Sequence, residues 1–123
     1  MPSRLLIGWK LVAGDQTMYV VNPATEEILA ECPRASNAQL NAAVAAAKAA
    51  FPAWSKTPII ERKAALGAIA DIVEKNATEL ARLLTQEQGK PLSDATGEVH
   101  GTAAFFRYFM ALDLPVKILD DSA

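Results

Sequence analysis

The stretch "LLTQEQGKPL", Leu83 to Leu92, places an acid, a glycine and a lysine close together. A phosphate-binding loop would need several glycines before a Lys-Ser or Lys-Thr pair, and it would open a helix. Here an apolar helical run is closing, with Gly89 at the C-cap, Lys90 complementing the helix dipole and Pro91 preventing continuation. The stretch therefore predicts a helix end, and only Glu87 remains a candidate for chemistry.

Cysteine and histidine chemistry is restricted because Cys32 and His100 are the only residues of their types. One cysteine excludes an internal disulfide and a cysteine metal cluster, and one histidine excludes the usual zinc sites. Cys32 stands in "AECPR" after a predicted strand, with neither a nearby base nor a helix N-terminus to activate its thiol. His100 is expected on a helix, in a surface or packing role. We therefore assign neither residue to catalysis.

The composition is that of a globular protein with one core: 51% of the 123 residues are hydrophobic, 21% are charged and the formal net charge is -2. No basic cluster appears, so we expect no nucleic-acid partner. The run "LNAAVAAA" is too short to span a bilayer, and the N-terminus lacks a long apolar segment with a cleavage site. We expect a cytoplasmic location and no membrane partner.

Residues from about 5 to 32 favour strands, in the segments "LLIGWKLV", "TMYVVN" and "EEILAEC". Gly14-Asp15 and Asn22-Pro23 supply turn chemistry between them, because glycine tolerates positive φ and proline fixes φ. Pro33 is expected to end this region. The pattern predicts a short antiparallel meander.

A first helix is predicted over 36–51, since Ser36 followed by Gln39 forms a capping-box pattern. Pro52 is expected to end this helix because proline removes an amide from the hydrogen-bond ladder. Trp54 is expected to be buried together with Phe51 at the corner after this helix. The predicted buried stripe of the helix consists of Leu40, Val44, Ala47 and Phe51.

A second helix is predicted over 58–88, with Thr57 as N-cap and Pro58 as its first residue, and a third over 93–112. The second helix would be ~45 Å long, although a chain of this size has a radius of gyration of about 14 Å. A short strand is expected from Val116 to Leu119. The third helix has two apolar sides, one with Val99, Ala103, Phe106 and Met110 and the other with Phe105, Phe109 and Leu112. An overlong helix and a two-faced helix are features of a piece of a larger fold.

Several blocks, in order, carry a family resemblance: "VVNPATEEILAECP", "AAVAAAKAAFPAW", "ERKAAL", "LTQEQGKPL", "EV" and "FFRY". Together they resemble the N-terminal part of the NAD(P)-dependent aldehyde dehydrogenase superfamily, from about Leu6 to Asp121. Within that superfamily they most resemble the bacterial aldehyde and semialdehyde dehydrogenases. The ordered set is specific, although no single block is. One departure is Glu26, which stands where the family usually has glycine at a turn, so we expect local strain there.

The resemblance implies an α/β family fold with a Rossmann-type cofactor domain, a catalytic domain and an oligomerisation extension, in chains several times longer. Residues 1–123 would form the N-terminal part of the cofactor-binding domain, as short antiparallel strands followed by three helices. The full-length enzyme would oxidise an aldehyde to a carboxylic acid with NAD or NADP, using a cysteine nucleophile and a glutamate base. This chain matches neither motif, so it has no catalytic or cofactor-binding residue to assign and is expected to be inactive alone.

The resemblance also implies one ion site. In several related enzymes a monovalent cation, Na or K, is held by carbonyls before the Asn-Pro turn and by the acid two residues before Gly-Lys-Pro. Carried over by position, these ligands are Val20, Val21 and Glu87. A carboxylate beside carbonyls at the negative end of a helix is chemically suited to a hard cation. The alternative is that Glu87 is an ordinary solvated helix residue.

Two further interpretations concern the aromatic part of the third helix. The side chains of Phe105, Phe106, Tyr108 and Phe109 would either pack in the core or, in one case, reach the family's aldehyde tunnel. Exposed apolar helix faces also predict a homo-oligomer. The rival functional hypothesis is a non-catalytic interaction module, or a self-associating truncated paralogue, that uses the face of Phe105, Phe106, Phe109 and Met110.

Overall fold

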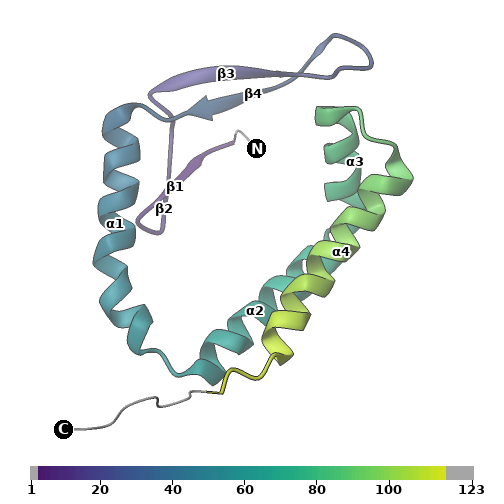
Figure 1. Cartoon of the computed structure of the whole chain (residues 1–123). Helices are drawn as coiled ribbons and strands as arrows, with labels where there is room; N and C mark the ends of the chain where they lie inside the picture. The colour runs from purple at the N-terminus through teal and green to yellow at the C-terminus, as the bar shows by residue number, and fades with distance from the viewer. Residues whose placement is uncertain (1–2, 116–123) are drawn as a thin grey trace, which may run out of the picture.

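The molecule is an open arch of two β-hairpins followed by four helices (Figure 1). The structure is a computed structural model that describes residues 3–115. Helix α1 stands apart from the α2, α3 and α4 helices, and the second hairpin lies above both (Figure 1). The elements in chain order are β1 (Leu5–Ile7), β2 (Lys10–Val12), β3 (Gln16–Val21), β4 (Ile28–Arg34), α1 (Asn37–Lys56), α2 (Ile59–Lys75), α3 (Ala77–Gln88) and α4 (Leu92–Ala111).

The first strand segment folds into a hairpin of its own. Gly8 and Trp9 have φ angles of 56° and 66°, and they form the turn that splits "LLIGWKLV" into β1 and β2. Two successive residues with positive φ give the strand twist that a tight hairpin needs. β2 does not pair with β3, so the predicted meander is wrong. The strands form two separate antiparallel two-stranded sheets.

The second hairpin pairs β3 with β4 around the predicted Asn22-Pro23 turn. The amide of Glu26 donates to the Asn22 carbonyl at 2.8 Å, and Glu26 has a φ of 59°, which confirms the expected unfavourable backbone angle there. β4 continues past Cys32 to Arg34, so the prediction that Pro33 ends the strand region is wrong. Proline is tolerated because each strand of a two-stranded sheet has a free edge that needs no amide donor.

The predicted capping box at the start of α1 is confirmed. Ser36 Oγ accepts from the Gln39 amide at 3.2 Å, and Gln39 Oε1 accepts from the Ser36 amide at 3.1 Å. Gln39 also reaches the β2–β3 connection, where its Oε1 accepts from the Asp15 amide at 3.0 Å and its Nε2 donates to the Ala13 carbonyl at 2.8 Å. One glutamine thus both caps the helix and fixes it to the strands.

α1 runs through Pro52 to Lys56, so the prediction of a helix ending at residue 51 is wrong. Proline removes one hydrogen bond, but the turn after it is supported by Thr57 Oγ1, which donates to the Ala53 carbonyl at 3.3 Å. No residue of α1 is buried, so the predicted buried stripe and buried corner are also wrong. More than half of the surface of each of these large apolar residues is exposed: Leu40, Val44, Phe51 and Trp54.

The predicted helix 58–88 is two helices, α2 and α3, separated at Asn76, so the described chain has four helices and not three. Asn76 Nδ2 donates to the Ile72 carbonyl at 2.7 Å and takes over part of the backbone hydrogen bonding. Asparagine competes for backbone groups in this way and favours helix ends. Thr57 follows α1, and the next helix begins one residue later than predicted, at Ile59 after Pro58.

α4 agrees with the predicted third helix to within one residue at each end. It packs along α2 and α3 through small side chains. At Gly67 the contact is tight, because an added β-carbon would lie 2.7 Å from Met110 Sδ. No large side chain is fully buried among residues 3–115. The buried apolar residues are Ala70, Ala77, Ala81, Ala95, Val99 and Ala103.

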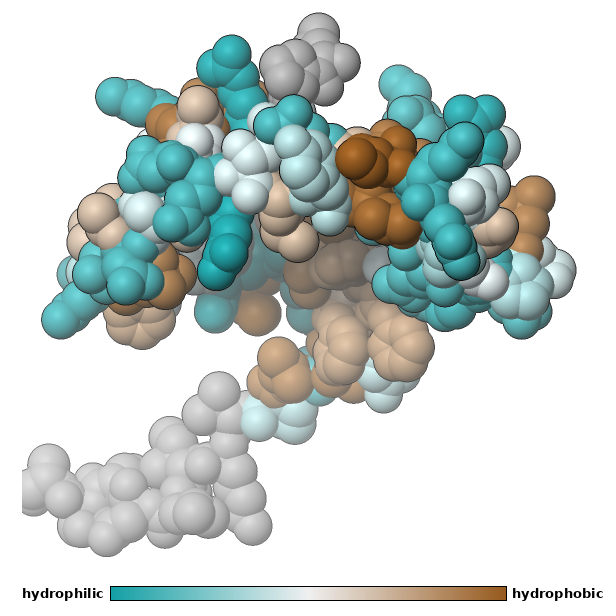
Figure 2. Space-filling model, turned by 90° about the horizontal axis from the view of Figure 1, so that it is seen from above, coloured by the Kyte–Doolittle hydropathy of each residue, from teal (hydrophilic) through white to brown (hydrophobic). Residues whose placement is uncertain are grey.

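Much apolar surface is therefore left exposed, and Figure 2 shows hydrophobic residues interspersed with hydrophilic ones on the face seen from above. In the part of the chain that the structure describes, no helix is long and apolar enough to cross a membrane. The predicted strand from Val116 to Leu119 lies outside the described residues.

Candidate functional site

The predicted cation ligands lie on two segments that meet in space. Val20 and Val21 end β3, directly before the Asn22-Pro23 turn, and Glu87 lies in the last turn of α3. A β-carbon added to Gly89 would lie 3.0 Å from Pro23 Cγ, so the turn after β3 touches the C-cap of α3. The fold thus brings the strand end and the helix end together.

The local geometry of β3 affects which carbonyls can face an ion. In a regular strand, successive carbonyls point to opposite edges, so Val20 and Val21 would not both face one ion. The pairing register shifts between these two residues, from Val20 with Ala30 to Val21 with Ile28. Such a bulge re-aims backbone groups and side chains.

Glu87 is exposed at the edge of a shallow apolar groove between α2, α3 and α4, and no hydrogen bond or ion pair within residues 3–115 holds its carboxylate. The same residues contain no cluster of three or more His, Cys, Asp or Glu side chains suited to a metal. Any cation here would therefore depend on backbone carbonyls beside this one acid.

The Gly-Lys-Pro stretch is a helix end, as predicted. Gly89 has a left-handed φ of 71°, and its amide donates to the Thr85 carbonyl at 2.8 Å. Lys90 pairs with Glu98 on α4 and so ties the turn to the next helix. Pro91 precedes the first turn of α4. Gly89 thus caps α3 and Lys90 pairs with Glu98, so the Gly-Lys-Pro stretch does not form a phosphate-binding loop.

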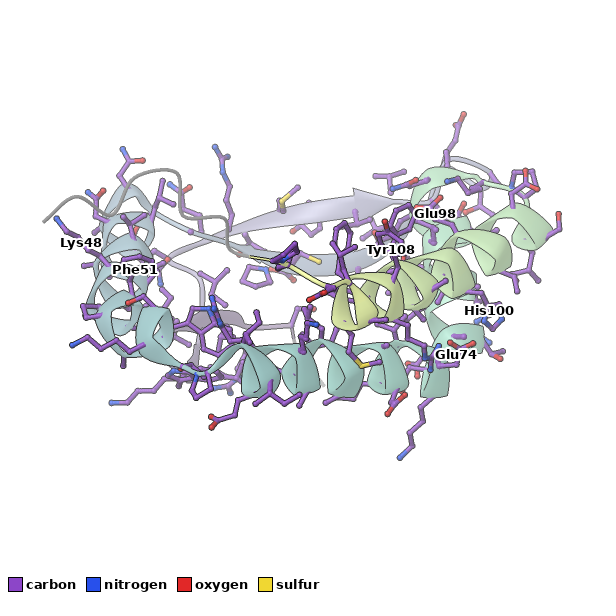
Figure 3. All side chains as sticks on the ribbon, turned by 60° about the horizontal axis from the view of Figure 1, so that its bottom comes forward. Lys48, Phe51, Glu74, Glu98, His100 and Tyr108 are labelled. Carbon is purple, nitrogen blue, oxygen red and sulfur yellow. The ribbon has the colours of Figure 1, made fainter. Side chains whose placement is uncertain are left out.

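An ion-pair network that the sequence patterns did not predict joins α2 to α4. Glu74 Oε1 lies 2.7 Å from His100 Nδ1, and Arg107 donates to Glu74 Oε2 at 2.8 Å and to Asp71 Oδ1 at 3.1 Å. The side chains of Glu74 and His100 approach each other in Figure 3. Because an ionised carboxylate only accepts, His100 Nδ1 is the protonated nitrogen. The signal for this network was the i, i+3 spacing of the two acids and the i, i+7 spacing of the two bases.

The network shifts two ionisation equilibria. The Arg107 guanidinium, and after it His100, hold the pKa of the Glu74 carboxyl below its usual value. The same contacts raise the pKa of Arg107. All four side chains are partly exposed to solvent, which screens such pairs. The network positions α4 on α2.

The aromatic side chains of α4 divide between two directions. Phe106 and Met110 are half-buried against α2, whereas Phe105 is 68% exposed. Phe109 is 51% exposed but lines the same cavity as Phe106. Tyr108 is also exposed; it contacts Phe109 edge to face and projects away from Glu74 in Figure 3. The predicted interaction face of α4 is therefore only partly available.

Cys32 is a partly buried free thiol in β4 that lines an open, mixed polar cavity of about 380 Å³ with Arg4 and Glu31. No histidine approaches it, since the only histidine of the chain lies on α4. The arrangement offers no histidine base for a thiol nucleophile.

The family model for aldehyde dehydrogenases matches residues 9–116, which is most of the chain and includes both sides of the Pro23–Gly89 contact. The chain belongs to the aldehyde dehydrogenase family. It is 44% identical over 119 residues to a probable aldehyde dehydrogenase of a Pseudomonas species, covering 97% of this chain and 24% of the relative. These matches confirm the predicted family.

Two more relatives of this aldehyde dehydrogenase chain show the range of the match. A human mitochondrial methylmalonate-semialdehyde/malonate-semialdehyde dehydrogenase is 41% identical over 98 residues, covering 78% of this chain and 18% of the relative. The solved structure of PnpE in complex with nicotinamide adenine dinucleotide matches with a TM-score of 0.85 at 36% identity, covering 95% of this chain and 26% of PnpE. Homologous structures hold NAD or NADP. The chain spans about a quarter or less of the length of these relatives.

Proposed function

We propose that this chain is the N-terminal part of the cofactor-binding domain of an NAD(P)-dependent aldehyde dehydrogenase of the semialdehyde type. The complete enzyme would oxidise an aldehyde to a carboxylic acid. The observation that carries the proposal is the match of nearly the whole chain to about a quarter of each relative. The small, alanine-rich core supports it, because so much exposed apolar surface is typical of a segment that packs on further structure.

The described residues do not fit a dinucleotide. A pyrophosphate site needs a glycine-rich turn that leads from a strand into a helix N-terminus. In residues 3–115 the only strand-to-helix connection is Ala35-Ser36, which has no glycine and whose Ser36 side chain already caps α1. We therefore place cofactor binding and catalysis in parts of the enzyme that this chain does not contain, and we expect the chain alone to be inactive.

The reading frame provides a first test of this proposal. We expect the coding DNA beyond Ala123 to continue in frame through the family's cofactor-binding and catalytic motifs. The product of that longer frame should reduce NAD or NADP when an aldehyde is added. A longer product that folds, binds NAD or NADP and turns over no aldehyde or semialdehyde would contradict the proposed activity.

We retain a cytoplasmic location as part of the proposal.

A monovalent cation site at Val20, Val21 and Glu87 remains a second proposal. It is supported by the contact of the strand end with the helix end and by the Glu87 carboxylate, which has no partner within residues 3–115. Crystals grown with rubidium or thallium should show an anomalous peak between the β3 carbonyls and Glu87. A map without a peak at that position, in crystals that contain the ion elsewhere, would rule the site out.

Self-association is the alternative function, and the exposure of Phe105 and Phe109 on α4 favours it. Its structural basis is weaker than the sequence indicated, because Phe106 and Met110 turn towards α2. If the chain works as a self-assembling module, Phe105→Arg should convert an oligomer into monomers in sedimentation velocity runs, whereas Gly97→Arg, at an open position on the same helix, should not. A monomeric wild-type chain would dismiss this alternative.

A further inference from the structure

The arch consists of two parts, residues 3–57 and residues 58–115, which are held together within themselves but scarcely to each other. In the first part β1 packs on β2, β3 on β4 and α1 on β1, and in the second part α2 and α3 pack on α4. Within residues 3–115, no hydrogen bond and no ion pair crosses from one part to the other. Parts of a chain that share no large apolar interface are expected to move relative to each other.

Each part has internal contacts that keep it rigid. In the first, Gln39 joins α1 to the β2–β3 connection, and that connection lies tightly on β4, because a β-carbon added to Gly14 would lie 2.8 Å from Pro33 Cβ. In the second, alanine residues pack between the helices, and Arg107 of α4 donates to Glu74 of α2 at 2.8 Å. Motion is therefore expected between the parts and not within them.

The link between the parts is short and has few free dihedral angles. Thr57 (φ -62°, ψ 128°) and Pro58 (φ -52°, ψ 143°) connect α1 to α2. Proline fixes its own φ and restricts the residue before it, so a rotation here is a directed swing. Beside the link, Trp54 of α1 and Phe106 and Phe109 of α4 line an open apolar cavity of about 470 Å³. Apolar contacts have no preferred direction, so this corner can serve as a pivot.

The far end of the arch is closed by a small contact without polar groups. There the β3–β4 turn lies above the end of α3 (Figure 1). A β-carbon added to Gly89 would lie 3.0 Å from Pro23 Cγ, so the proline ring rests against the bare α-carbon of the glycine. Such a contact can separate without unfolding either part. It can close because residue 89 has no side chain.

We propose that the chain is a hinged arch. Residues 3–57 and 58–115 swing as two bodies about Thr57 and Pro58, and the arch opens and closes at the contact between Pro23 and Gly89. Hinges of this kind are a few residues at the ends of elements that take up the change in backbone angles. The inference goes beyond the proposed function and does not depend on it, because it concerns the 123-residue chain itself.

Distances between pairs of spin labels test the hinge in the 123-residue chain. Labels are attached to introduced cysteines in a Cys32→Ser background, which removes the only native thiol. Exposed positions Ala24, in the β3–β4 turn, and Arg82, on α3, span the open end of the arch. Ala24 with Lys48 reports on the first part alone, and Arg82 with Ala104 on the second. Double electron–electron resonance should show two distances across the arch and one narrow distance within each part.

Two variants should shift the distances across the arch. Gly89→Ala places a β-carbon against Pro23 in the closed arch, and should raise the ratio of the longer to the shorter distance about 3-fold or more. Gly97→Ala, which meets no atom within 4 Å, is the matched control and should leave the ratio unchanged. Pro58→Gly frees the link and should broaden the distances across the arch, while both internal distances stay as they were.

Three results would overturn the inference. The first is one distance across the arch, as narrow as the two internal distances, which would show a single rigid body. The second is a Gly89→Ala or Pro58→Gly chain whose distances across the arch equal those of the parent chain. The third is an internal distance that broadens together with the distance across the arch, because a part would then be unfolding and not swinging. None of these results bears on the proposed function.

Discussion

At the scale of single residues, the side chains of Gln39, His100 and Arg107 connect elements that are far apart in the sequence. Gln39 completes the capping box and also binds the β2–β3 connection, which no local pattern reveals because the partners are far apart in sequence. His100 and Arg107 hold Glu74 across the α2–α4 seam. Cap patterns are local and therefore predictable, whereas ion pairs between helices depend on packing that one sequence does not specify.

Glu26 tests the local strain in the β3–β4 turn. Its φ of 59° is unfavourable for a residue with a β-carbon, so Glu26→Gly should stabilise the chain by about 1 kcal/mol. Urea unfolding followed by circular dichroism measures this change. Glu27→Gly, where φ is not positive, is the control and should destabilise. Equal effects of the two substitutions would show that the backbone angle is not the cause.

The Glu74 network predicts a pH dependence with a definite sign. Because the pKa of Glu74 is lowered in the folded state, the network stabilises the chain above the usual glutamate pKa, and this contribution is lost as pH falls through the lowered value. Urea midpoints of the wild type and Glu74→Gln should differ near neutral pH and converge once the pH has fallen below the lowered pKa of Glu74. Glu61→Gln is the control on the same helix. A difference that grows on acidification would refute this account.

At the scale of elements, caps and turns are predicted more accurately than the course of the chain between them. The Asn22-Pro23 turn, the start of α1, the end of α3 and the extent of α4 are confirmed, because caps and turns have local physical causes. The Pro33 and Pro52 predictions are wrong, since an edge strand and a supported helix turn tolerate proline. The break at Asn76 was not predicted because the apolar spacing continues across it.

The contact between α3 and the β3–β4 turn is testable at Gly89. Gly89→Ala would place a β-carbon at positive φ and 3.0 Å from Pro23 Cγ, and should destabilise the chain by about 1–2 kcal/mol. Gly97→Ala on α4 meets no atom within 4 Å, and should stabilise by about 1 kcal/mol because alanine favours helix. Thermal unfolding compares them. A neutral Gly89→Ala would argue against the contact, and with it against the cation site.

At the scale of the whole molecule, the chain has strong local structure around a very small core. The helices form and pack through alanine and glycine, yet large side chains such as Leu40, Phe51, Trp54 and Phe105 remain exposed. Sequence patterns identified these residues as apolar faces but not as uncovered ones, because hydrophobic spacing marks a surface without saying what lies against it. The predicted α/β fold of the longer family chains is represented here by one segment of that fold.

We propose that the chain supplies a structural part of an aldehyde dehydrogenase and not its chemistry. The direct test is an NAD(P)H absorbance assay, with aldehydes and semialdehydes, of two proteins. One is the 123-residue chain, and the other is the Pseudomonas relative in which residues 1–115 of this chain replace the matching segment. We predict no turnover by the chain alone and aldehyde-dependent reduction of NAD or NADP by the chimera. Turnover by the isolated chain, or a folded chimera without activity, would contradict the claim.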